Sequence, residues 1–188
     1  IYTALEEGVD GIEIDVRHAH GRLWVIHDET VDRTTNGTGL LRKLSLHTLS
    51  GLDAGKGETI PSLEDVIEAV GENLTFNVEL KDDASAVDAV KILERHQSTE
   101  SFLVSSFSAK ALRIVRKLNH ELKIGVLYDE GDLDDYFSLA EELGAVAIHP
   151  NFQLASRSLI RRAHKAGLKV YCYTVNNFWL ALRLKKLG

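Results

Sequence analysis

The sequence predicts an α/β fold, most simply a (β/α)8 barrel that lacks its first and last strands. Apolar β-type runs alternate with helical patterns along the chain, which is typical of β-α units around a parallel sheet. The 188 residues with 44% hydrophobic content suffice for one globular core. Six such strands are two short of a closed barrel, and an open doubly wound sheet is the alternative.

The expected elements follow one another in a steady order. The strands cover residues 11–17, 76–81, 102–107, 123–128, 145–149 and 169–175. The helical patterns cover residues 62–71, 85–97, 108–119, 132–143, 156–166 and 177–187. Ser62, Ser108 and Ser156 precede apolar periodicity and are expected helix N-caps. Gly144 and Gly167 mark expected helix ends.

Three regions depart from this order. Residues 2–7 have a helical pattern without a preceding strand, and the chain stops at Gly188 where another strand is expected, so we expect a truncated barrel. Residues 28–60 form an insertion, and insertions of this length are usually functional or disordered. Its glycine-rich stretch at 34–39 lacks the Lys and spacing of a P-loop, so a turn-rich segment is expected there.

Two strands carry acids where buried strands carry apolar residues. Because side chains alternate across a strand, Glu13 and Asp15 share one face, as do Glu79 and Lys81 on the other strand. Burying an unpaired carboxylate is costly, so the three acids predict a cation among them. Without His or Cys nearby, Mg²⁺ or Ca²⁺ suits them better than zinc. A solvated edge with an ordinary Glu79–Lys81 ion pair is the alternative.

His27 follows the strand-like run 24–26 and could reach the mouth of the sheet as a general acid or base. A surface histidine on a hairpin is the alternative. The runs 105–107 and 171–174 close later strands, where aromatic and hydroxyl side chains commonly line a pocket. No Gly-x-Ser-x-Gly elbow is present and Cys172 has no activating partner in sequence, so covalent hydrolase chemistry is not indicated.

The bulk composition excludes several classes of protein. A formal charge of -6 argues against a general nucleic-acid binder. No apolar run of about 18 residues or more is present, so no transmembrane segment is expected. A single cysteine, Cys172, cannot form an internal disulfide and suits a reducing compartment, so we expect a cytoplasmic protein. The oligomeric state cannot be inferred from the sequence.

The motifs together resemble the glycerophosphodiester phosphodiesterases in order and spacing, over nearly the whole chain. Any one of them is weak, but eight in the right sequence make coincidence very unlikely. They are GVDGIEIDV (8–16), VIHD (25–28), DRTTNGTG (32–39), IPSLE (60–64), NVELK (77–81), SSF (105–107), HPN (149–151) and VYCYTVN (170–176).

The resemblance implies a TIM barrel and the metal-dependent hydrolysis of a glycerophosphodiester to sn-glycerol 3-phosphate and an alcohol. Glu13, Asp15 and Glu79 fall on the family's metal ligands, which implies a divalent cation, Mg²⁺ or Ca²⁺. His27 falls on one of its two catalytic histidines. The small-molecule partner expected from the resemblance is the glycerophosphodiester itself.

The resemblance also assigns the rest of the site. Lys81 falls on a basic position near the substrate phosphate. Tyr173 stands where the family usually has Trp, a change that keeps an aromatic wall for the substrate but alters its size. Residues 28–60 correspond to the family's insertion, which helps to cover the glycerol end of the site.

One departure from the family bears on activity. The family's other catalytic histidine lies in a His-Arg-Gly motif at the end of the first strand, and that strand is missing here. We therefore expect little or no turnover from this chain alone. Two alternatives follow: a non-catalytic binding domain that has lost the first-strand His and Arg, and a lysophospholipase D-type phosphodiesterase, which would need an apolar groove.

Overall fold

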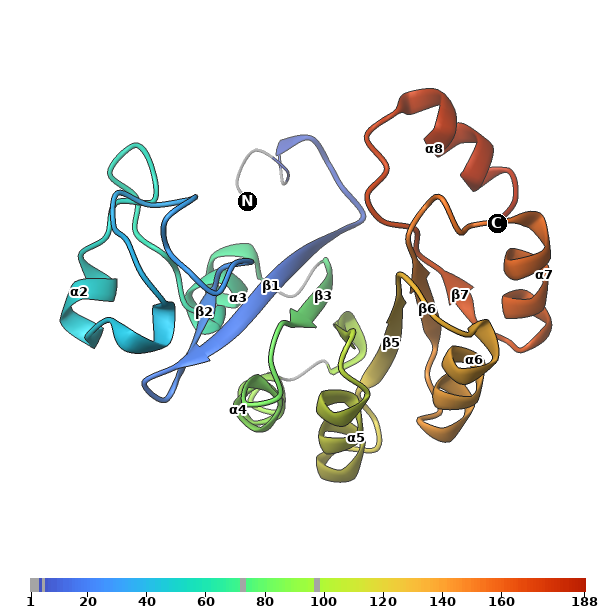
Figure 1. Cartoon of the computed structure of the whole chain (residues 1–188), viewed down its shortest axis with the longest axis horizontal. Helices are drawn as coiled ribbons and strands as arrows, with labels where there is room; N and C mark the ends of the chain where they lie inside the picture. The colour runs from blue at the N-terminus through green and yellow to red at the C-terminus, as the bar shows by residue number, and fades with distance from the viewer. Residues whose placement is uncertain (1–3, 5, 72–73, 97–98) are drawn as a thin grey trace.

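The computed structural model describes residues 4, 6–71, 74–96 and 99–188. Their strands form one sheet of seven strands in the order β2-β1-β3-β4-β5-β6-β7 (Figure 1). The strands are β1 (Gly11–Ala19), β2 (Arg22–Val25), β3 (Thr75–Leu80), β4 (Phe102–Ser106), β5 (Lys123–Tyr128), β6 (Ala147–Pro150) and β7 (Lys169–Val170). The α-helices are α2 (Leu46–Ser50), α3 (Leu63–Val70), α4 (Ser85–Leu93), α5 (Ala109–Leu118), α6 (Leu133–Glu142), α7 (Arg157–Lys165) and α8 (Phe178–Lys185), and the 3-10 helices are η1 (Leu41–Lys43) and η2 (Thr99–Ser101).

The strand order distinguishes the two predicted architectures. From β1 through β3 to β7 each strand pairs in parallel with the next one along the chain, and only β2 is antiparallel, in a hairpin with β1. A doubly wound sheet reverses its strand order at a switch point, whereas a barrel does not. In Figure 1 the sheet curves, and α4, α5, α6 and α7 lie along its convex side. The α/β prediction is therefore confirmed as a barrel-type winding, which does not close into a ring among the described residues.

The convex face of the sheet is the apolar face that the alternation predicts. Val16, Val78, Val104, Ile124 and Ile148 are almost fully buried in one core cluster beneath the helices. Burying each such side chain contributes about 1.5–3 kcal/mol, which fixes this face against the helices. Because neighbouring side chains point the opposite way, the polar residues between them are turned toward the concave face.

The helix boundaries follow the predicted caps. The Ser62 hydroxyl accepts a hydrogen bond from the Asp65 N–H at 3.2 Å, and the Asp65 carboxylate accepts one from the Ser62 N–H at 2.8 Å, which completes a capping box. Ser108 and Ser156 accept bonds from backbone N–H groups in the first turns of α5 and α7. Gly144 follows α6 with a positive φ of 55°, as a helix end requires.

Some predicted boundaries were wrong. The predicted strand 169–175 is regular only over Lys169–Val170, and parallel pairing then resumes at a single bridge between Tyr173 and Asn151. The Tyr171 N–H still donates to the Ile148 carbonyl at 3.0 Å, but the next bond of a parallel ladder would come from the N–H of residue 150, and Pro150 has none. The predicted helix 85–97 ends at Leu93, and residues 97–98 lie outside the described residues. Residues 2, 3 and 5 of the predicted opening helix also lie outside the described residues, and Ala4 and Glu6 are helical.

The insertion is a packed unit rather than a disordered one. Trp24, Ile26, Val31, Leu41, Leu49, Leu52 and Ile60 are members of its own buried cluster, apart from the main core. A Cβ atom on Gly37 would lie 2.6 Å from the Leu52 Cδ2 atom, so the glycine-rich stretch packs closely against this cluster. Within the part of the chain that the structure describes, no helix has the length and hydropathy to cross a bilayer.

Candidate active site

All six site residues predicted from the sequence line one cavity of about 800 Å³. The cavity lies on the concave side of the sheet and extends from Gly11 and Thr75, where β1 and β3 begin, to the segments that follow β3 and β7. Barrel enzymes place their functional groups at the carboxyl ends of the strands, and this is the part of the cavity that contains Glu79, Lys81 and Tyr173. The six residues are Glu13, Asp15, His27, Glu79, Lys81 and Tyr173. They come from β1, β3 and the segments that follow β2, β3 and β7.

The three acids form a tight cluster because of the register between β1 and β3. Asp15 pairs with Glu79 and Glu13 with Asn77, so the inward-facing side chains of two neighbouring strands stand beside one another. One carboxylate oxygen from each of Glu13, Asp15 and Glu79 lies within 4.8 Å of the others. The predicted juxtaposition of the three acids is thus present.

A single lysine accompanies the three carboxylates. The Lys81 Nζ atom donates to the Glu79 Oε1 atom at 2.5 Å and lies 3.5 Å from the Asp15 Oδ1 atom. Burial first, and then the negative charges of Asp15 and Glu79, raise the pKa of Glu13 to about 7 against the opposing effect of Lys81. Burial also raises the pKa of Glu79, with Lys81 opposing it. The cluster therefore carries more negative charge than Lys81 alone offsets.

This donor set fits a divalent cation. Carboxylate oxygens are the ligands that Mg²⁺ and Ca²⁺ prefer, and the cluster has no His or Cys among its three members. Glu13 is solvent-accessible from the cavity, which leaves room for water molecules or a substrate oxygen to complete a coordination shell. The residues present can accordingly hold a hard metal ion.

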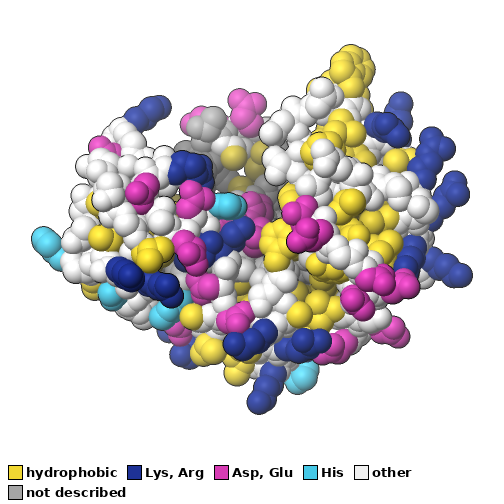
Figure 2. Space-filling view, viewed as in Figure 1, with side chains coloured by type: hydrophobic (Ala, Val, Ile, Leu, Met, Phe, Trp, Pro, Cys, Tyr) yellow, Lys and Arg dark blue, Asp and Glu magenta, His cyan; other side chains and the backbone are white. Residues whose placement is uncertain are grey.

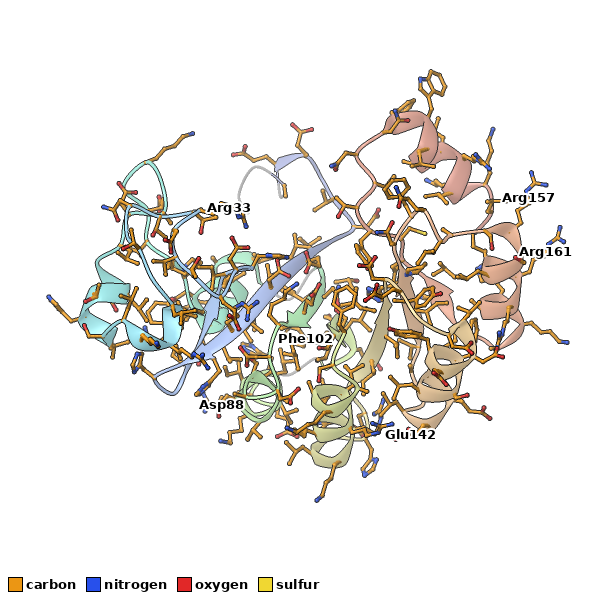
Figure 3. The ribbon with its side chains drawn as sticks, in the orientation of Figure 1. Arg33, Asp88, Phe102, Glu142, Arg157 and Arg161 are labelled. Carbon is orange, nitrogen blue, oxygen red and sulfur yellow. The ribbon has the colours of Figure 1, made fainter. Side chains whose placement is uncertain are left out.

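His27 is oriented by two side chains whose role the sequence did not reveal. The His27 Nδ1 atom lies 2.7 Å from the Asp28 Oδ1 atom. Arg33 donates hydrogen bonds to both oxygens of the Asp28 carboxylate, at 2.6 and 3.0 Å. Figure 3 shows Arg33 on the side of the insertion that faces the sheet. The hydrogen bonds from Arg33, and to a smaller extent the one from His27, hold the pKa of Asp28 well below its usual range. Because an ionised carboxylate only accepts hydrogen bonds, Nδ1 must carry the proton, which leaves Nε2 free.

An aromatic wall stands opposite the acids. The Tyr173 hydroxyl donates to the Tyr128 carbonyl at 3.2 Å, and its ring meets that of Phe107 edge-on at 5.8 Å between centroids. Burial, with Asp129 nearby, raises the pKa of Tyr173, so the hydroxyl remains protonated. Burial likewise raises the pKa of the Cys172 thiol, which argues against a cysteine nucleophile.

In or beside the cavity wall, which includes Asn77 and His149, lie buried polar atoms that the sequence did not single out as a group. Asn77 Oδ1, Ser105 Oγ and His149 Nε2 have no hydrogen-bond partner among the described residues. Burial lowers the pKa of His149 to about 4, so its imidazole is neutral at pH 7. The sequence indicated only that His149 ends a strand. Its ring fills the space above Gly125 on the neighbouring strand, where a Cβ atom would lie 2.4 Å from Nε2.

We expect Gly125→Ala to destabilise the protein by about 1–3 kcal/mol, because the new methyl group overlaps the buried imidazole. Urea unfolding followed by circular dichroism measures the change. In the double variant Gly125→Ala/His149→Ala the imidazole is absent, so Gly125→Ala should not add this overlap penalty to the cost of His149→Ala. Gly51→Ala is the control, since its Cβ would meet only ordinary contacts at 3.6 Å or more. Equal stability of Gly125→Ala and the parent would contradict this packing.

A sequence model of the glycerophosphoryl diester phosphodiesterase family matches residues 1–188. The chain belongs to this family. A glycerophosphodiester phosphodiesterase of Caldanaerobacter subterraneus subsp. tengcongensis is 36% identical, over 98% of this chain and 82% of that protein. The predicted family and its class, a phosphoric diester hydrolase, are therefore confirmed.

Solved structures with the same fold agree with the family membership. A phosphodiesterase of Oleispira antarctica, solved in complex with the product sn-glycerol-3-phosphate, has a TM-score of 0.92 and 29% identity, and the match covers 100% of this chain and 81% of that one. A glycerophosphodiester phosphodiesterase of Agrobacterium tumefaciens has a TM-score of 0.84 and 27% identity, over 98% of this chain and 83% of that one. The barrel fold predicted from the sequence is confirmed by these likenesses.

Proposed function

We propose that the protein hydrolyses glycerophosphodiesters to sn-glycerol 3-phosphate and an alcohol at the cavity formed by β1, β3 and β7, with a divalent cation bound by Glu13, Asp15 and Glu79. The observation that carries the proposal is the convergence of these carboxylates, Lys81 and His27 on one cavity. The Oleispira relative, solved with sn-glycerol-3-phosphate, supports the choice of substrate.

Each side chain has a role that follows from its position. Lys81 supplies positive charge for a substrate phosphate, and its flexible stem lets it leave Glu79 when a metal or a phosphate arrives. Asp28 holds His27 so that Nε2 is free to exchange a proton with the attacking or the leaving oxygen. A divalent cation, when bound, neutralises charge on the phosphate oxygens.

The remaining parts of the chain enclose the substrate. Tyr173 and Phe107 would form the aromatic wall beside the alcohol or the glycerol moiety. We treat the chain as one catalytic domain in which the insertion at 28–60 helps to cover the glycerol end. A cytoplasmic location remains a prediction, supported by the single free cysteine, Cys172.

The test is release of sn-glycerol 3-phosphate from glycerophosphocholine by the natural full-length protein. We expect EDTA to abolish release, and either Mg²⁺ or Ca²⁺ to restore it after removal of the chelator. A parallel assay with lysophosphatidylcholine distinguishes a lysophospholipase D-type enzyme. Release that survives chelation would contradict the metal assignment, whereas binding of glycerophosphocholine without turnover would indicate a non-catalytic barrel.

A further inference from the structure

A groove between α5 and α6 adjoins the active-site cavity. It has a volume of about 530 Å³, and Phe107 lines both the groove and the cavity. The Phe107 side chain is 46% exposed, and the centroid of its ring lies 5.8 Å from the Lys81 Nζ atom. An alcohol group attached to a phosphate at Lys81 can therefore pass along Phe107 into the groove.

The groove lies in the middle of the sheet rather than at one of its edges. It is formed where α5 follows β4 and α6 follows β5, and these two strands pair on their outer sides with β3 and β6. Figure 1 shows α5 and α6 between α4 and α7. Arg113 of α5 donates to both carboxylate oxygens of Glu142, each at 2.7 Å, which ties the two helices together. The elements that form the groove therefore have described neighbours on both sides.

Two aromatic rings line the groove. Phe107 stands at the end nearest the cavity, and Tyr136 lines the groove from α6. The Tyr136 ring packs edge-on against Tyr128 with 4.5 Å between centroids, and a Cβ atom on Gly131 would lie 3.6 Å from the same ring. The Tyr128 hydroxyl donates to the Gly131 carbonyl at 3.3 Å, so the loop and the two rings support one another. The faces of such rings attract cations.

The groove also carries an excess of negative charge. Four carboxylates and a single guanidinium line it, and that guanidinium, Arg113, is paired with Glu142. The ion pairs of the described residues leave Glu130, Asp132 and Asp135 without a cationic partner. The Asp132 side chain caps α6 by accepting a bond from a first-turn N–H group at 2.8 Å. Figure 2 shows Asp and Glu side chains gathered over α6. Glu130 and Asp135 are thus available to a positively charged ligand.

This arrangement suits a large, diffuse cation rather than a metal ion. A metal ion needs oxygen ligands that converge on one point. Among the described residues, the set of three carboxylates that converges in this way is Glu13, Asp15 and Glu79, and the acids of the groove do not. Quaternary ammonium groups, by contrast, are recognised by aromatic rings, and a nearby negative charge adds a long-range attraction.

We propose that the α5–α6 groove is the subsite for a cationic alcohol, such as choline, of the glycerophosphodiester substrate. Phe107 and Tyr136 provide aromatic faces for the ammonium group, and Glu130 and Asp135 balance its charge. In such an ester only an oxygen and two carbons separate the phosphorus from the nitrogen, so an ammonium group beside Phe107 is compatible with a phosphate at Lys81. The inference rests on the proposed function and identifies the leaving group that the enzyme prefers.

Substrate selectivity provides the first test. The natural full-length protein should hydrolyse glycerophosphocholine with a kcat/KM roughly tenfold higher than that for the neutral analogue in which a carbon atom replaces the choline nitrogen. The two esters have the same shape and differ in charge, so their ratio isolates recognition of the cation. Glu130→Gln/Asp135→Asn and, separately, Tyr136→Leu should each lower this preference to about threefold or less.

Binding of the cation can be measured without turnover. Saturation-transfer NMR with choline chloride, in the presence of Mg²⁺, reports contact between the choline methyl groups and the protein. We expect a signal that is weaker with the neutral alcohol and is lost in Tyr136→Leu and in Glu130→Gln/Asp135→Asn. Glu64→Gln/Glu68→Gln removes two exposed carboxylates of α3 and is the matched control, which should behave like the parent in both assays. Thermal unfolding verifies that each variant folds, and the exposed positions of Glu130 and Asp135 keep that double variant informative if Tyr136→Leu unfolds.

Two kinetic results would overturn the proposal. One is an equal kcat/KM of the parent for the charged and the neutral ester, and the other is a preference for the choline ester that Glu130→Gln/Asp135→Asn retains in full. If no glycerophosphodiester is hydrolysed, the proposed function fails, and the NMR measurement still decides the role of the groove. A choline signal that is absent from the parent, or that is unchanged in Glu130→Gln/Asp135→Asn, would then exclude it.

Discussion

Glu79→Gln should lower kcat/KM for glycerophosphocholine by at least about 100-fold. Loss of a residue that only orients a metal ligand lowers activity by up to about 100-fold, and loss of a ligand itself should cost at least as much. The substitution preserves the size of the side chain but removes the charge from a residue that is only 8% exposed between Asp15 and Lys81. Glutamine supplies one neutral oxygen where the metal site requires an anion. Activity is measured across a range of Mg²⁺ and Ca²⁺ concentrations, which gives the change in kcat/KM. Calorimetric titration with each ion gives the change in metal affinity.

The stability of the metal-free Glu79→Gln variant should be equal to or higher than that of the parent, although its activity falls. Burial raises the pKa of Glu79, so the carboxylate is less favourable in the folded chain than in the unfolded one at neutral pH. The metal-free Glu79→Gln variant should therefore unfold at an equal or higher urea concentration than the parent, and loss of activity would not reflect misfolding. Glu141→Gln, on the exposed surface of α6, is the matched control and should leave activity unchanged. Unaltered metal affinity in Glu79→Gln would contradict the ligand assignment.

His27→Ala should lower kcat by roughly 10²–10⁴-fold, the range for loss of a general acid or base. The effect should fall on kcat more than on KM, because Lys81 and the carboxylates that would hold the cation are unchanged. The measurement is steady-state kinetics between pH 5 and 9 at a saturating metal concentration.

Two further variants test how His27 acts. Asp28→Asn leaves the imidazole in place but removes the anion that selects its Nδ1–H form, so we expect a smaller loss of kcat, roughly tenfold. His47→Gln, an exposed histidine on α2, should behave like the parent. If His27→Ala kept full activity, the proton-transfer role would have to be assigned to another residue.

Much of this protein could be predicted from local patterns. The β-α alternation and the shared faces of Glu13–Asp15 and Glu79–Lys81 follow from periods of 3.6 and 2 residues along the backbone. The helix caps at Ser62, Ser108 and Ser156 follow from the ability of a Ser hydroxyl to accept a hydrogen bond from a first-turn N–H group. The motifs indicated the family. Periodicity does not predict the distance between segments that are far apart in the sequence, because that distance depends on sheet register and curvature.

Tertiary structure therefore determined the features that join distant segments. The β1–β3 register brought the three carboxylates within 4.8 Å of one another, and the fold of the insertion set Arg33 against Asp28 behind His27. Parallel pairing likewise put His149 over Gly125. The sequence by itself determined which residue types face inward. Only the packing of the strands and helices decided which of them meet, because contact between distant segments depends on how whole elements bury their apolar faces.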